Sequence, residues 1–135
     1  MCDTVRSSPS VRVLAPDARR LERDELIALG STRVSGRGRS IVLERCRHMV
    51  AVAGSAVVGV AAFELELGEL RVYELCVHPF DADVLTALIT ALELACLAAG
   101  GFRIYVAASA TIGAEALAPF GYEPAGGRWL EKGVA

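Results

Sequence analysis

The clearest pattern in the chain is a strand followed directly by a long apolar helix, between residues 70 and 102. Residues 70–77 are predicted to form the strand, residues 78–81 break it, and residues 82–99 form the longest apolar helix candidate. Gly100 and Gly101 end that helix. A helix that starts where a strand stops leaves backbone N–H groups without intrahelical partners, which favours anions and phosphates. This strand–helix junction is therefore the first candidate binding site.

The rest of the pattern supplies strands around this unit. Residues 48–53 and 55–67 are two strands joined by a tight hairpin at Gly54 and Ser55, and with residues 70–77 they make an antiparallel meander. Residues 102–106 form a strand after the long helix, and such a crossover implies that strands 70–77 and 102–106 are parallel neighbours. The remaining predicted elements are a short strand at 11–14, a helix capped by Asp17 that runs to about residue 29, a brief helix from Ser40 to residue 47, a helix at about 111–117, and a strand pair that turns at Gly126 and Gly127 and ends with residues 128–132.

Length and composition fit one domain. The 135 residues divide into a polar N-terminal tail, residues 1–10, expected to be disordered, and a single domain over residues 11–135. The net charge of −2 argues against nucleic acid as a partner. The start lacks the regions of a signal peptide and the four cysteines form no Cys-x-x-Cys pair, so we expect a cytoplasmic protein with reduced thiols. Thr86, Thr90 and Glu93 interrupt the long apolar helix, which is also short for a membrane span, so no membrane partner is expected.

Several local motifs occur in an order that resembles one known superfamily. Residues 75–79, Leu-Cys-Val-His-Pro, fit a strand that ends in apolar-x-Val-x-Pro, and residues 83–92 follow the apolar helix that comes next. Residues 120–122, Phe-Gly-Tyr, match a later Leu-Gly-Phe, and residues 129–132, Trp-Leu-Glu-Lys, match the usual last strand. Over about residues 11–132 the chain thus resembles the GNAT superfamily of acyl-CoA-dependent N-acyltransferases. The resemblance implies an α+β fold with a mixed central sheet flanked by helices.

The resemblance also implies a site for acetyl-CoA or another acyl-CoA at the strand–helix junction. The matching positions are Cys76 and Val77 at the strand end and Asp83, Val84, Leu85 and Thr86 at the helix start. The usual Arg/Gln-x-x-Gly-x-Gly/Ala loop is shortened here, and Asp83 and Leu85 replace its glycines. Those glycines let the backbone approach a pyrophosphate closely, whereas Asp83 adds negative charge. We therefore expect an atypical loop and weak acyl-CoA binding.

Catalytic positions follow from the same resemblance. Glu74 lies on the central strand where superfamily members often place a general base, which could deprotonate an ammonium substrate. The alternative is a structural carboxylate paired with Arg71 or Arg103. The tyrosine that is a usual general acid is Leu117 here, and an asparagine found after the fifth strand falls near Ser109, which keeps hydrogen-bonding capacity.

A basic loop at residues 35–40 is a second candidate site. Arg37 and Arg39 stand among glycines before a possible helix start, as in a phosphate-binding loop, but no strong strand leads into it. The two interpretations are a loop that binds an anion or an acidic substrate, near the acceptor of an acyltransferase, and an ordinary solvated loop.

Glu74, Cys76 and His78 alternate along one strand and so point to one face. A thiol beside an imidazole could be an activated nucleophile or belong to a metal site. Residues two apart on a strand lie roughly 6.5–7 Å apart, beyond direct hydrogen bonding unless the strand bends. Cysteine is also a routine core residue, so we expect a packing cysteine and no bound metal.

Two classes of function remain open at this stage. One is an acyltransferase that acts on a small-molecule amine, and the other is a non-catalytic GNAT-fold binding or interaction module that has lost acetyl-CoA binding. The polar stripe of helix 82–99 is narrow for a helix on one sheet face, which predicts a homodimer that buries helix or sheet-edge surface.

Overall fold

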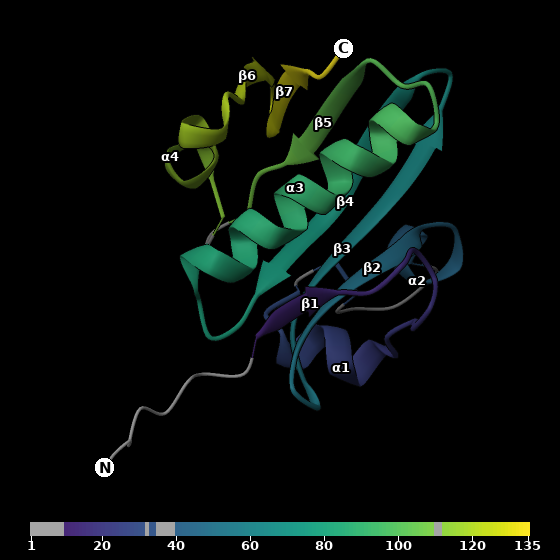
Figure 1. The fold of residues 1–135 in the computed structure, drawn as a ribbon, viewed down its shortest axis with the longest axis vertical. Helices are drawn as coiled ribbons and strands as arrows, with labels where there is room; N and C mark the ends of the chain where they lie inside the picture. The colour runs from purple at the N-terminus through teal and green to yellow at the C-terminus, as the bar shows by residue number, and fades with distance from the viewer. Residues whose placement is uncertain (1–9, 32, 35–39, 110–111) are drawn as a thin grey trace.

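The protein is one mixed seven-stranded sheet with helices on both faces (Figure 1). The computed structural model describes residues 10–31, 33–34, 40–109 and 112–135, so Arg37, Arg39 and most of the predicted tail lie outside the described residues. The strand order is β1-β2-β3-β4-β5-β7-β6. The elements are β1 Val11–Val13, α1 Arg23–Ala28, α2 Ile41–Glu44, β2 Arg47–Ala53, β3 Ala56–Glu66, β4 Glu69–Val77, α3 Ala82–Ala98, β5 Arg103–Ala107, α4 Ala114–Leu117, a 3-10 turn at Ala118–Phe120, β6 Glu123–Gly126 and β7 Trp129–Gly133.

The predicted meander and crossover are confirmed. β2, β3 and β4 pair antiparallel in sequence order, and β4 and β5 pair parallel from Glu69 opposite Arg103 to Val72 opposite Val106. The 17 residues of α3 bridge the two parallel strands across one face. These features confirm the α+β class, with a mixed sheet between helices.

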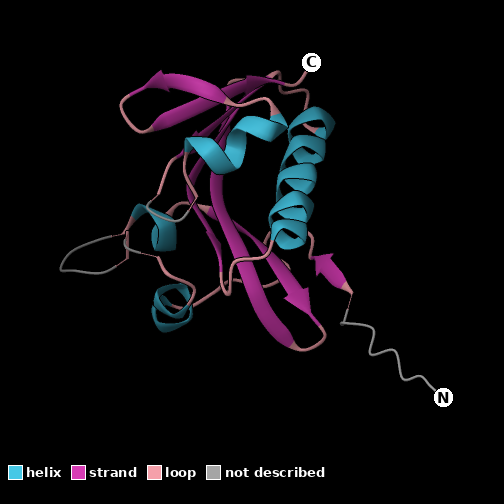
Figure 2. Cartoon of the chain, turned by 90° about the vertical axis from the view of Figure 1, so that its left-hand side faces the viewer, coloured by secondary structure: helices cyan, strands magenta, loops and turns pink. Residues whose placement is uncertain are grey.

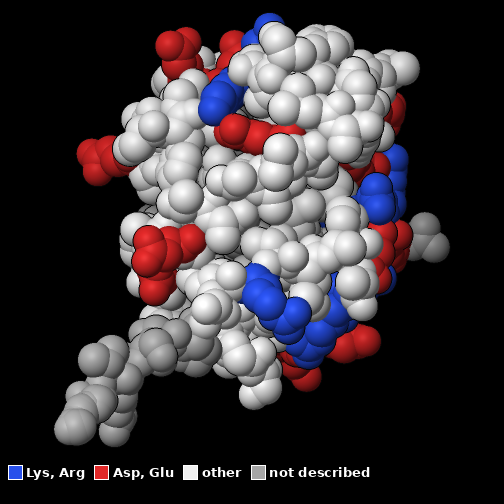
Figure 3. All heavy atoms as spheres, in the orientation of Figure 1, with Lys and Arg blue, Asp and Glu red and all other residues white. Residues whose placement is uncertain are grey.

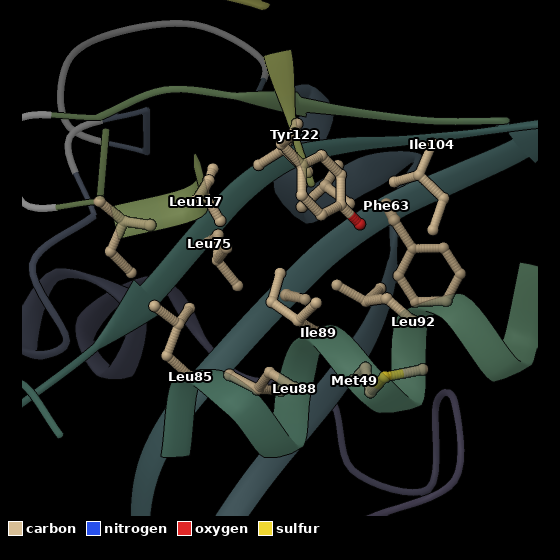
Figure 4. Close-up of a cluster of buried hydrophobic side chains, with 14 of the residues drawn as sticks. Met49, Phe63, Leu75, Leu85, Leu88, Ile89, Leu92, Ile104, Leu117 and Tyr122 are labelled. Carbon is tan, nitrogen blue, oxygen red and sulfur yellow. The ribbon is translucent and has the colours of Figure 1, made fainter. Parts of the chain in front are cut away.

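The two faces of the sheet carry two separate apolar cores (Figure 2). α3 buries one stripe against the first face, and Figure 4 shows Leu85, Leu88, Ile89 and Leu92 pointing from the helix toward the sheet. α1 and α2 cover the second face over β2, β3 and part of β4, with Leu26 fully buried there. No helix in the described part of the chain is both long and apolar enough to span a membrane.

The first helix is shorter than predicted, because Asp17 has another role. α1 begins at Arg23, and Asp17 does not cap it. Asp17 has a positive φ of 61° and accepts hydrogen bonds from the backbone N–H of His48 (2.9 Å) and from Nε of Arg47 (3.1 Å). It therefore ties the segment before α1 to β2. The second helix also ends early, at Glu44, because β2 already begins at Arg47.

Candidate functional site

The sheet splits between β4 and β5. Their pairing stops at Val72 and Val106, although β4 continues to Val77, whereas Ala107 of β5 pairs only with Trp129 of β7. At the same point the register between β3 and β4 shifts, from Phe63 opposite Val72 to Ala62 opposite Glu74. Tyr73 is thus the extra residue of a β-bulge, which bends the strand. Figure 1 shows the carboxyl ends of β4 and β5 apart.

Glu74 is the buried carboxylate beside this split. The residue is 4% exposed, and its Oε2 lies 3.4 Å from Nε of Arg33, in the segment between α1 and α2. The partners considered from the sequence are engaged elsewhere, because Arg71 pairs with Glu69 and Arg103 with Glu131. Arg33 lies far from Glu74 in the sequence, and no local sequence pattern links the two residues. The ion pair between them therefore could not be predicted from the sequence. The site thus holds a carboxylate whose charge is balanced by one partly buried arginine.

Cys76 shows no sign of nucleophile activation. Burial raises the pKa of its thiol, and the neighbouring Glu74 carboxylate, its hydrogen-bond partner, raises that pKa further. The thiol therefore stays protonated, while a nucleophilic cysteine needs a lowered pKa. His78 is exposed, and its backbone N–H donates to the Val58 carbonyl (3.0 Å). Within the described residues no three His, Cys, Asp or Glu side chains gather closely enough to hold a metal ion.

The start of α3 is already occupied by a side chain of this protein. Oδ1 of Asp81 accepts hydrogen bonds from the backbone N–H of Asp83 (2.8 Å) and of Val84 (3.3 Å). These are the groups that a bound anion would use at a helix start. Asp81 therefore acts as an N-cap, as an aspartate directly before an apolar helix often does. Figure 3 shows acidic side chains at the start of α3 and a mostly uncharged surface along the helix.

The side chains of the other predicted acyl-CoA positions point mainly into the protein. Val77, Val84 and Leu85 belong to the core under α3, and Cys76 belongs to the core on the opposite face. Thr86 is exposed, and its hydroxyl donates to the Ala82 carbonyl (2.8 Å). From this set, only backbone groups and the exposed side chains of Asp83 and Thr86 can face a ligand. A hollow of about 520 Å³ lies at this end of α3, lined by Ser10, Val11, Ala53, Val58, Pro79, Phe80, Asp81, Asp83 and Val84.

Ser109 and Leu117 frame the segment that follows β5. The Ser109 hydroxyl accepts a hydrogen bond from the backbone N–H of Ile112 (3.0 Å), which helps to shape the turn before α4. Leu117 is fully buried, and Figure 4 shows its side chain in the core that α3 covers. The usual tyrosine position is thus filled by an apolar core residue, so α4 offers no acid group there.

An aromatic cluster lies on the face of the sheet opposite α3. The ring centroids of Tyr73 and Trp129 are 5.6 Å apart, those of Tyr105 and Trp129 are 6.5 Å apart, and both pairs are edge-to-face. The Arg71 guanidinium lies over the Tyr105 ring, 5.7 Å from its centroid. Sequence reasoning missed this cluster. A signal was available in the alternation of side chains along each strand. Tyr105 and Trp129 directly neighbour the buried Ile104 and Leu130, so their side chains are expected on the opposite face of the sheet.

Comparisons of the chain and its structure with known proteins identify the fold. No family model and no curated protein sequence matches the chain. An acetyltransferase of the GNAT family from Staphylococcus aureus superposes with a TM-score of 0.68 and 12% identity, over 93% of this chain and 100% of that one. The chain has the GNAT fold. An N-acetylglutamate synthase from Neisseria gonorrhoeae, solved with coenzyme A and L-arginine, superposes with a TM-score of 0.71 and 15% identity, over 95% of this chain and 34% of that one. The Escherichia coli ribosomal-protein-S18-alanine N-acetyltransferase superposes with a TM-score of 0.60 and 13% identity, over 93% of this chain and 94% of that one.

Proposed function

We propose that this GNAT-fold protein is an acyl-CoA-dependent N-acyltransferase that acylates a small-molecule amine in the cytoplasm and binds its acyl donor weakly. The observation that carries the proposal is the split between β4 and β5 with the buried Glu74 carboxylate beside it. Beyond Val72, β4 pairs only with β3. The other edge of β4 is therefore unpaired there and faces the split. An amide-containing chain can pair with such an edge as an added strand.

The acyl donor fits the two parts of this site unequally. The pantetheine arm of an acyl-CoA contains amides, which suit the open edge of β4. The phosphates do not suit the start of α3, because Asp81 occupies the N–H groups of Asp83 and Val84 and two carboxylates add like charge. This inequality is the physical reason for proposing a dissociation constant of roughly 100 μM or weaker for acetyl-CoA.

Glu74 is the proposed proton acceptor. An amine is protonated at neutral pH and becomes a nucleophile only after losing a proton, which a positioned carboxylate accepts. Acyl-CoA would supply the acyl group as a thioester. Ser109 is proposed as a hydrogen-bonding residue near the reacting groups, and Arg37 and Arg39 as acceptor contacts, although those two arginines lie outside the described residues.

The second candidate function is a non-catalytic binding or interaction module. It is favoured by the Asp81 cap, which occupies the N–H groups at the start of α3, and by Leu117, an apolar core residue at the position of the usual general acid. The exposed Leu94 and Leu97 on the outer side of α3 support the further proposal of a homodimer, in either function. Light scattering that gives a monomer mass at ~100 μM would contradict the dimer, since an interface of standard size should hold there.

Calorimetry with acetyl-CoA, followed by an assay for free CoA thiol with a panel of amines, tests the proposed function. An N-acyltransferase gives weak, saturable binding and releases thiol only when an acceptor amine is present. A binding module gives no thiol release with any amine. Low-micromolar binding of acetyl-CoA would be compatible with the proposed enzyme activity, but it would contradict the proposal that Asp81 weakens acyl-CoA binding.

A further inference from the structure

The aromatic face, defined here as Tyr73, Tyr105 and Trp129, lies next to the split. Tyr73 is the bulge residue and directly precedes Glu74 along β4, and its ring packs edge-to-face against Trp129. Trp129 pairs with Ala107, where β5 has already left β4. The cluster therefore spans the region between the split and the C-terminal strands. Its position is continuous with the candidate active site.

The aromatic face is accessible in the described part of the protein. α1 and α2 pack over β2, β3 and the Cys76 end of β4, and Figure 2 shows no helix over β5 and β7 on that side. All three rings are half-buried. Among the described residues, no hydrogen bond engages the Tyr105 hydroxyl or the Trp129 indole N–H. The Tyr73 hydroxyl, by contrast, is hydrogen-bonded to the Glu64 carboxylate, and burial together with this carboxylate raises the pKa of Tyr73. Two flat rings thus present free donors beside the split.

The charges around the aromatic face are balanced. Three ion pairs border it, which join Arg71 to Glu69 (2.6 Å), Arg103 to Glu131 (3.5 Å) and Arg45 to Glu64 (3.6 Å). Glu74 is balanced as well, by Arg33. A ligand with several positive charges needs a surplus of carboxylates, and these pairs provide none. The surface therefore favours a ligand that binds through apolar contact area and through packing against aromatic rings, not through several charges.

We propose that the aromatic face selects the acceptor, and that the acceptor is a primary amine carried on a flat, apolar body, such as an arylalkylamine. This inference rests on the proposed acyltransferase function. The ring of the acceptor packs against Tyr105 and Trp129, where aromatic pairs gain energy beyond area burial. The ammonium group extends past Tyr73 toward Glu74. The single ammonium group is thus matched to the remaining hydrogen-bond acceptor capacity of the Glu74 carboxylate, whose charge Arg33 balances, and the rest of the ligand to the rings.

Trp129 makes binding measurable without any acyl transfer, because it is the only tryptophan in the chain. We would titrate the native protein with 2-phenylethylamine, which absorbs too far in the ultraviolet to interfere with tryptophan emission. The expected result is a saturable change in Trp129 emission. Spermidine, with several charges and no ring, is expected to give no saturable change. Saturation by spermidine and not by 2-phenylethylamine would overturn the inference.

Tyr105→Leu is the test variant, because it removes a ring and keeps the tryptophan reporter. Affinity for 2-phenylethylamine should fall by about three- to tenfold, the range expected for losing one aromatic pair. Phe102→Leu is the matched control, since Phe102 is another exposed ring (48%) and packs against Gly68. The control should bind as the native protein does. Equal loss in both variants, or in neither, would contradict the assigned role of Tyr105.

The outcomes separate this inference from the proposed function. Binding of 2-phenylethylamine without acyl transfer supports the aromatic face and contradicts the enzyme. Acyl transfer to spermidine without any emission change supports the enzyme and overturns the inference. Emission that changes with protein concentration alone would mean that a second copy of the chain covers the face, and this result also overturns it.

Discussion

The two ends of the candidate site differ in what their backbone offers a ligand. At the split, β4 runs beyond its last pair with β5 and presents an open edge next to Glu74. At the start of α3, the N–H groups of Asp83 and Val84 are already bonded to the Asp81 carboxylate. The first feature depends on strand register and a bulge, and the second on one side chain. An open strand edge and a helix start that is occupied by a side chain can therefore occur together in one fold.

Replacing the short loop should have the largest effect on this comparison. In the variant, residues 80–85 are replaced by an eight-residue Arg-x-x-Gly-x-Gly loop and helix start, which frees N–H groups and removes two carboxylates. Like charges near the phosphates cost on the order of 1–4 kcal/mol, so acetyl-CoA affinity should rise by about ten- to a thousandfold. Calorimetry on both proteins measures the change. If the native protein already binds at low micromolar strength, the two ends do not differ as described.

Glu74→Gln tests the other end of the site. If the protein is an acyltransferase, turnover should fall by about a hundredfold or more, as expected when a positioned base is lost. Glu69→Gln is the matched control, because Glu69 lies on the same strand and also pairs with an arginine, but at the far end from the split. Its turnover should stay near the native value. Unchanged turnover in Glu74→Gln would make this carboxylate a purely structural partner of Arg33.

The sequence predicted the scaffold of the site but not the details that decide its chemistry. The parallel pairing of β4 and β5 follows from a strand, a long apolar helix and a second strand, which is a local pattern. The bulge at Tyr73 depends on the register between two strands, and the Arg33–Glu74 pair joins positions far apart in the chain. No local pattern encodes either of these. The Asp81 cap is different, because an aspartate directly before an apolar helix is a signal that the sequence did contain.

Asp81→Ala sharpens the comparison at a single residue. It removes one charge and frees two N–H groups, so acetyl-CoA affinity should rise by about tenfold, while loss of the cap should cost about 0.5–2 kcal/mol of stability. Asp83→Ala is the control, since it removes the same charge without touching the cap. Its affinity should rise by less, and its stability should stay nearly unchanged in chemical denaturation. Equal gains in both variants would mean that charge alone, and not the occupied N–H groups, weakens binding.

Acid should lower the stability of the protein through His48, which is fully buried on the face of the sheet that α1 and α2 cover. Its Nδ1 accepts a hydrogen bond from the Leu21 N–H (3.1 Å), and its Nε2 lies 2.9 Å from the Val42 carbonyl, which fits a neutral ring with the proton on Nε2. Burial lowers the pKa of His48, and the positive charge of Arg20 adds to this, against the Val42 hydrogen bond and Asp17, which raise it.

A lowered pKa in the folded protein means that the unfolded chain binds more protons than the folded one just below pH ~6.5, the usual pKa of histidine. Stability should therefore be greatest above that pH and should fall as the pH drops toward the folded pKa, by at most about 1.4 kcal/mol per pH unit. The pKa of Asp17 is also lowered, but its protonation changes the stability of the protein only near pH 4 and below, because the ordinary pKa of this group is 3.8. Urea denaturation between pH 5 and pH 7, compared in the native protein and in His48→Gln, measures the His48 contribution. The variant should be less stable at pH 7 and should lose the slope between pH ~6.5 and pH 5, whereas an equal slope in both proteins would assign the acid sensitivity to another group.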